Sequence, residues 1–138
     1  MTEHVTGGCR CGAIRFHFDH PPVAVRACWC RDCQYLSSGN ASVSAIFRTA
    51  GLTLTGTPAA YESAADSGNT MRRRFCGNCG TPLFSEASDT PDFMVVRAGA
   101  LDDPALAPPT STIWTASAPP WGLIDPALPR CDGQPRRE

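Results

Sequence analysis

The chain has 138 residues and a net charge of -1, so its length suits one domain and its charge gives no case for nucleic acid as a partner. Thirteen prolines and twelve glycines predict a turn-rich chain, which argues against long helices. No apolar run could cross a membrane or export the N-terminus, so we expect a cytoplasmic protein. All twelve basic residues are arginine, which excludes Schiff-base chemistry and a lysine general base.

Alternating segments predict a mainly β fold of antiparallel sheets with few short helices. Residues 13–19 alternate, with Ile14, Phe16 and Phe18 on one face, as in a half-buried strand. Further strands are predicted at residues 23–27, 41–47, 51–56, 59–62, 70–76, 81–85, 92–99 and 111–116.

The strands are predicted to belong to one domain that occupies residues 1–138. Its core spans about residues 5–129, and residues 130–138 are predicted to form a tail. One helical turn is expected in the segment from Gln34 to Gly39, and Gly39 would end it, because glycine commonly ends a helix. Residues 63–69 are polar and are predicted to form a hairpin loop.

Seven of the eight cysteines lie in three short groups, and the eighth, Cys131, is interpreted as a lone thiol. The groups are Cys9-Arg10-Cys11, Cys28-Trp29-Cys30-Arg31-Asp32-Cys33 and Cys76-Gly77-Asn78-Cys79. Two thiolates one or two residues apart can face the same metal ion at a tight turn. Disulfides are the alternative, but they need an oxidising compartment, and nothing at the N-terminus indicates export. The spacing therefore predicts metal binding.

The first and third groups together supply four thiols, the number that closes a structural zinc site. These thiols are Cys9, Cys11, Cys76 and Cys79. A glycine follows each pair directly, which suits a turn where backbone N–H groups approach the sulfurs.

The central group supplies only three thiols: Cys28, Cys30 and Cys33. A zinc ion with three protein ligands keeps an open position, which is typical of a reactive metal. Two alternatives stay open at this point. Cys131, Asp32 or a histidine could fill the fourth place, or one central cysteine could leave the site and only one zinc would bind.

Five motifs follow one another along the chain: G-G-C-R-C-G, then C-W-C-R-D-C with a following S-S-G, then R-R-F-C-G-N-C-G-T-P-L, then G-A-L-D-D-P and a late P-P-W. This order of motifs resembles the glutathione-dependent formaldehyde-activating family, whose domain is shared with centromere protein V. The resemblance runs over about residues 7–129. Two positions depart from the family pattern, because Trp29 and Thr112 stand where relatives often have histidine.

The resemblance implies a zinc-stabilised fold of the β-tent type with two zinc ions per chain. It implies that the closed set of four cysteines holds a structural zinc, and that Cys28, Cys30 and Cys33 hold the zinc tied to catalysis. The implied activity joins a small thiol such as glutathione to formaldehyde or another small aldehyde, and is classed in reverse as a carbon–sulfur lyase. The two departures leave no imidazole expected near the second zinc.

Arginines could receive the carboxylates of such a thiol. Arg31, Arg72 and Arg74 are the candidates by their place in the sequence, with Arg73 expected on the opposite face of the same strand. The alternative is that the arginine run is a solvated face. A non-catalytic zinc-binding scaffold is the alternative for the whole protein, and an iron–sulfur or rubredoxin-like iron site is a third interpretation.

Overall fold

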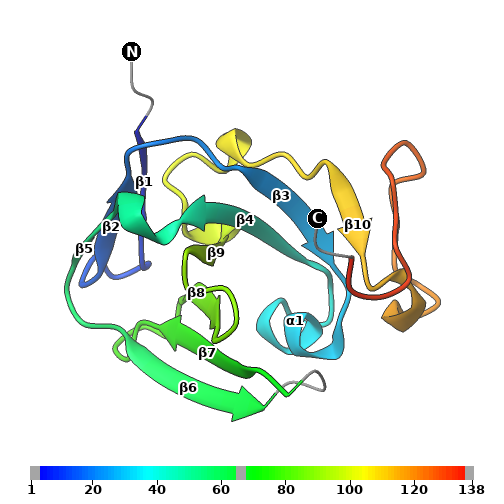
Figure 1. The fold of residues 1–138 in the computed structure, drawn as a ribbon, viewed down its shortest axis with the longest axis horizontal. Coiled ribbons are helices and arrows are strands. Elements are labelled where there is room, and N and C mark those ends of the chain that lie inside the picture. The colour runs from blue at the N-terminus through cyan, green and yellow to red at the C-terminus, as the bar shows by residue number, and fades with distance from the viewer. Residues whose placement is uncertain (1–3, 65–67, 136–138) are drawn as a thin grey trace.

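Two β-sheets pack against each other across a core rich in phenylalanine (Figure 1). The structure is a computed structural model and describes residues 4–64 and 68–135. The smaller sheet has the strand order β1-β2-β5, and both of its pairs are antiparallel. Its strands are Val5–Gly8, Arg15–Phe18 and Leu52–Thr55.

The larger sheet has the strand order β10-β3-β4-β9-β8-β7-β6. Its strands in chain order are β3 Ala24–Cys28, β4 Ser42–Arg48, β6 Ala59–Ala64, β7 Thr70–Phe75, β8 Pro82–Ala87, β9 Phe93–Arg97 and β10 Ser111–Ile113. Every neighbouring pair is antiparallel except β10 and β3, which run parallel. The larger sheet is therefore mixed, which the prediction of antiparallel sheets did not include.

A single α-helix, α1 (Arg31–Leu36), is present in the described part of the chain. It follows β3 directly and lies between β3 and β4 on one side and β6 and β7 on the other (Figure 1). Short 3-10 turns occupy Thr49–Gly51, Ala98–Ala100, Pro104–Leu106 and Thr115–Ser117. The predicted mainly β fold with few short helices is confirmed. No helix among these residues has the length and apolarity to cross a membrane.

Aromatic contacts join the two sheets. The ring of Phe18 in β2 stacks on Phe47 in β4 with centroids 4.1 Å apart, and Phe16 meets Phe84 of β8 edge-on at 5.2 Å. All four side chains are almost completely buried. The alternation read from residues 13–19 therefore identified the core face of β2 correctly, because every second side chain of a strand points to the same side.

Strand β1 was missed by the sequence-based prediction, which placed a glycine turn at its end. Gly7 nevertheless pairs with Phe16 and forms a bridge with Leu101. A Cβ atom at Gly7 would lie 2.4 Å from the Ala100 carbonyl oxygen and 2.4 Å from the Phe16 ring. The residue is glycine because two neighbours occupy the space of a side chain, so a packing requirement overrides the low strand propensity.

Two segments outside the strands also bear on the predictions. The expected hairpin loop lies partly outside the described residues, because 65–67 are not described. The expected tail is hydrogen-bonded to β10 and to the residues directly after it, as far as Gln134, which accepts from Trp114 Nε1. The Thr112 N–H donates to the Pro129 carbonyl at 2.9 Å, and the Cys131 N–H donates to the Thr112 carbonyl at 2.9 Å.

Replacement of Gly7 by alanine should destabilise the protein by about 1–3 kcal/mol, because the added methyl group has no room. Gly99→Ala is the matched control, since a Cβ at Gly99 meets nothing within 4 Å. We expect the control to stay within about 0.5 kcal/mol of the parent protein in urea unfolding. Equal stability of the two variants would show that the packing around Gly7 yields easily.

Candidate metal centres

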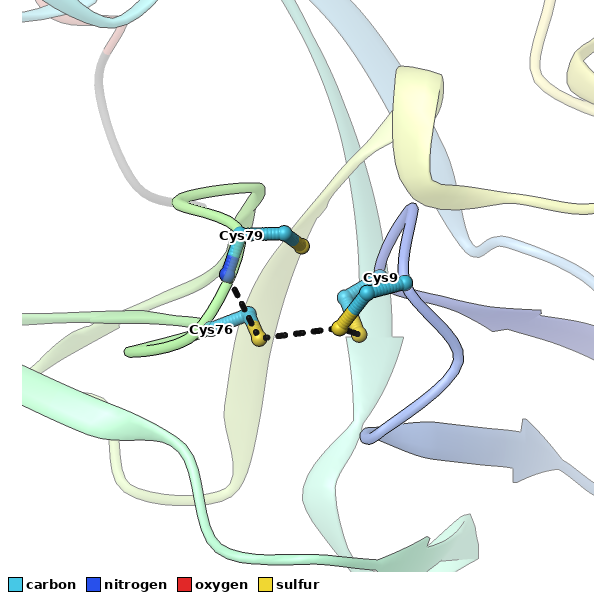
Figure 2. Close-up of side chains that lie close together, drawn as sticks. Cys9, Cys76 and Cys79 are labelled. Carbon is cyan, nitrogen blue, oxygen red and sulfur yellow. Dashed lines mark hydrogen bonds between the residues drawn. The ribbon is translucent and has the colours of Figure 1, made fainter.

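The four-cysteine cluster joins two turns that belong to different sheets. Cys9 and Cys11 lie in the turn from β1 to β2, and Cys76 and Cys79 lie in the turn from β7 to β8. The four Sγ atoms all lie within 4.8 Å of one another. Cys11 Sγ is 3.6 Å from Cys9 Sγ and 3.8 Å from Cys76 Sγ, and Figure 2 shows Cys9 and Cys76 meeting across the gap between the turns.

Each turn directs N–H groups at its own sulfurs. The Ile14 N–H donates to Cys9 Sγ at 3.2 Å, and the Cys79 N–H donates to Cys76 Sγ at 3.4 Å. Gly12 and Gly80 make these turns possible, since their φ angles of 83° and 81° lie in the left-handed region. Donated hydrogen bonds of this kind stabilise thiolates, the form in which cysteine binds metal.

The turn around Cys79 lowers the pKa of its thiol. The Thr81 hydroxyl lies 3.2 Å from Cys79 Sγ and donates to the thiolate. This bond, with hydrogen bonds from the Thr81 and Cys11 backbone, lowers the pKa of Cys79 to about 5. Cys79 is therefore prepared to bind a cation at neutral pH without an extra cost of deprotonation.

The three-cysteine cluster forms where β3 ends and α1 begins. Cys28 is the last residue of β3, Cys30 caps the N-terminus of α1, and Cys33 lies in its first turn. The Cys33 N–H donates to Cys30 Sγ at 3.4 Å, so the helix cap and the cluster are the same structure. The three Sγ atoms lie within 4.8 Å of one another, with Cys28 and Cys33 buried.

The three central thiols share their protons unequally. Hydrogen bonds from Cys28 and Cys33 lower the pKa of Cys30, while the bond to Cys30 raises the pKa of Cys28. One thiolate is thus stabilised by two thiols, and three thiolates together would repel one another without a cation. An all-sulfur donor set in a buried place fits a divalent metal that accepts thiolate ligands, such as zinc.

Arg97 is a residue of this centre that the sequence-based prediction missed. Its Nη1 donates to Ser44 Oγ at 2.8 Å and to Ser42 Oγ at 3.1 Å, and lies 3.8 Å from Cys33 Sγ. The strand register places Arg97 opposite Ser44 and Cys28 opposite Ser42, which brings the arginine to the cluster. An arginine in an otherwise apolar strand, Phe93–Arg97, was the available signal.

The arginines that the sequence suggested lie elsewhere. Arg72 is exposed, and Arg31 lies over the Tyr35 ring and donates to Gln34. Arg74 pairs with Glu86 at 3.1 Å, and Arg73 reaches Asp32 on α1 at 3.2 Å. For the described residues, no hydrogen bond or ion pair joins Arg31, Arg72 or Arg74 to a central cysteine.

The residues considered as a fourth ligand are also outside the cluster of three sulfurs. Asp32 is exposed and paired with Arg73, and His20 is bonded to Asp19 beside the smaller sheet. Cys131 packs against the buried group of Cys28, Cys33 and Ile113, but its sulfur is not one of the atoms that meet within 4.8 Å. The described residues therefore give this cluster three metal-ligating atoms.

A cavity of about 620 Å³ is lined by residues that lie next to each of the two clusters. It reaches from Thr81 and Pro82, next to the four-cysteine cluster, to Ser42 and Arg97, next to the three-cysteine cluster. A smaller cavity of about 140 Å³ shares Leu36, Pro82 and Arg97 with it. Arg97 lines both cavities, and its Nη1 lies 3.8 Å from Cys33 Sγ, so it links the cavities to the central cysteines.

The sequence and the fold were compared with those of known proteins. Residues 4–117 match the family described as glutathione-dependent formaldehyde-activating enzyme. The fold is similar to a crystal structure of a Rhodobacter sphaeroides protein, with a TM-score of 0.58 and 15% identity over 91% of this chain and 98% of that one. No curated protein matches the sequence. The family match covers most of the chain, and the chain belongs to the glutathione-dependent formaldehyde-activating enzyme family.

Proposed function

We propose that this protein is a zinc enzyme that joins a small thiol such as glutathione to formaldehyde or another small aldehyde. The observation that carries the proposal is a cluster that holds three cysteine sulfurs among the described residues, two of them buried, near a cavity and in a chain of this family. The sulfur of the thiol forms a bond to the carbonyl carbon, and the thiol proton passes to the carbonyl oxygen. The reverse reaction breaks the same carbon–sulfur bond, which is lyase chemistry.

The two clusters take different roles in this proposal. Cys9, Cys11, Cys76 and Cys79 hold a structural zinc, because four sulfurs complete its coordination. Cys28, Cys30 and Cys33 hold the second zinc and leave one position for the substrate. When bound there, zinc supplies the lowered pKa that turns an incoming thiol into a thiolate.

The residues of the chain set the conditions for this chemistry. Burial of Cys28 and Cys33 keeps bulk water from the sulfurs, while Cys30 is half-buried and lies nearer to solvent. Gln34 ties α1 in place, because its side-chain N–H groups donate to the Trp29 carbonyl at 2.8 Å and the Ser117 carbonyl at 3.0 Å. The cap, and with it the spacing of the three sulfurs, is thereby fixed before a ligand arrives.

A second function stays in view because Cys131 packs against the central group. If its sulfur moved in to complete the coordination, the second zinc would be structural and the protein would be a binding scaffold. Cys131→Ser tests the point directly. The enzyme proposal expects this variant to keep both zinc ions and its activity.

The division of roles predicts different results for serine variants of the two clusters. Cys76→Ser should lose zinc and largely unfold, because a structural zinc contributes its binding free energy to folding. Cys30→Ser should lose one zinc equivalent while keeping the β-rich circular dichroism spectrum. Metal analysis and thermal melting measure both effects, with Cys131→Ser as the matched cysteine control. A Cys76→Ser protein with two zinc ions and the parental melting temperature would refute the assignment.

The activity itself is testable with cobalt in place of zinc. Glutathione should change the thiolate-to-metal absorption of the cobalt protein, whereas S-methylglutathione should not, because it cannot offer a thiolate. Formaldehyde added next should be consumed faster than in a control with thiol and the Cys30→Ser variant. If no thiol changes the absorption spectrum, the enzyme proposal is refuted and the scaffold function remains.

A further inference from the structure

We propose that Arg97 binds a carboxylate of the substrate thiol and makes the enzyme select thiols that carry an acid group near the sulfur. The inference rests on the proposed function, because it names the substrate class of the same site. It assigns the main role in carboxylate recognition to a buried arginine of β9, which the sequence did not suggest. Burial, cavity lining and distance to the cysteines support it independently.

Arg97 is a buried cation with no carboxylate partner among the described residues. Its side chain belongs to a residue that is only 9% exposed, and its hydrogen bonds come from Nη1 to two serine hydroxyls and a thiol. Three other arginines, Arg15, Arg73 and Arg74, each pair with a carboxylate. In the described part of the chain, no carboxylate pairs with Arg97. A buried charge is costly unless an opposite charge meets it. A bound anion would supply that charge.

Both cavities beside the cysteines are lined by Arg97. In the larger one it is the single charged residue among the described lining, which otherwise consists of alanine, proline and other uncharged side chains. A carboxylate in such a place forms a charge-assisted hydrogen bond with little competition from water. The guanidinium can also offer two parallel N–H groups, which match the two oxygens of a carboxylate.

The smaller cavity adds a separate observation. It is lined by Arg73 and Arg74 as well as Arg97, and Arg73 Nε is a buried donor with no hydrogen-bond partner in the described structure. Buried donors in folded proteins are nearly always satisfied, so a donor without a partner beside a cavity points to a ligand that accepts hydrogen bonds. Three arginines in the lining favour an anionic ligand.

The distance between Arg97 and the cluster sets where the acid group must lie. Nη1 is 3.8 Å from Cys33 Sγ, so a thiol that reaches the three sulfurs carries its first carbon atoms past the guanidinium. A carboxylate two or three bonds from the sulfur can then meet Arg97 while the sulfur stays at the cluster. Short acidic thiols are therefore the substrate class that this geometry favours within the proposed function. Glutathione carries its free carboxylates on the residues that flank its cysteine, too far from the sulfur to meet Arg97 in this way.

Arg97 could instead serve only to offset the negative charge of three thiolates. The two roles differ in what they discriminate. A counter-charge strengthens the binding of metal and of every thiol alike, whereas a carboxylate site strengthens only ligands that carry the acid group. A pair of ligands that differ in that group alone separates the roles.

The experiment measures the affinity of the zinc-loaded protein for 3-mercaptopropionate and for its neutral amide by calorimetry. The parent protein should prefer the acid by about tenfold, the size expected for one charge-assisted contact. Arg97→Gln should bring the preference to about one while the amide binds as before. If Arg97→Gln fails to fold, Arg97→Lys is the replacement variant, because it keeps a positive charge in the core. It should retain only part of the preference, since lysine cannot offer two parallel N–H groups to the carboxylate.

Arg72→Gln is the matched control, since Arg72 is exposed on β7, which β8 separates from β9, and it should keep the full preference. Equal binding of acid and amide by the parent protein overturns the inference. Equal weakening of both ligands by Arg97→Gln overturns it as well and leaves Arg97 as a counter-charge.

A sulfur-free pair, propionate and propionamide, separates this inference from the proposed function. Chemical-shift changes of the protein report binding of these two ligands. If no thiol binds the metal, the proposed function is refuted. A preference for propionate that is lost in Arg97→Gln would still support the carboxylate site. In the other outcome, thiols bind and react while the protein binds 3-mercaptopropionate no better than its amide and propionate no better than propionamide. In that case the carboxylate site is refuted and the proposed function stands.

Discussion

The two sheets meet at a point where sulfur atoms from distant parts of the chain come together. Cys11 and Cys76 are 65 residues apart, yet their sulfurs lie 3.8 Å from each other. The turn of the smaller sheet is thereby held against a turn of the larger sheet at one edge of the phenylalanine core. A cation at this point would close a long loop, which lowers the entropy of the unfolded chain and turns metal affinity into folding stability.

The two clusters show how the same ligand type gives different chemistry through its setting. The first cluster draws two residues from each of two turns and has four sulfurs, so it can complete a tetrahedron. The second draws all three sulfurs from one strand end and one helix cap, where local geometry supplies no fourth. What surrounds the second cluster therefore decides its chemistry, and Arg97 and the cavity are its nearest surroundings.

Sequence reasoning found the strands and the grouping of the cysteines because both are local patterns. Alternation reveals the core face of β2, and short spacing reveals ligand pairs. It missed β1, where Gly7 satisfies a contact with Phe16 and Ala100 that no local pattern encodes. It also missed Arg97, since the approach of that side chain to Cys33 depends on the register of β9, β4 and β3.

The C-terminal segment beside β10 has a consequence for how copies of the protein meet. An unpaired strand at the margin of a sheet presents open N–H and carbonyl groups that invite another chain to add to the sheet. Here Pro129 and Cys131 already use the backbone groups of Thr112, and the segment around them lies along that margin. The C-terminal segment thus covers the β10 edge of the larger sheet, which limits the addition of a strand from another copy to the opposite edge, formed by β6.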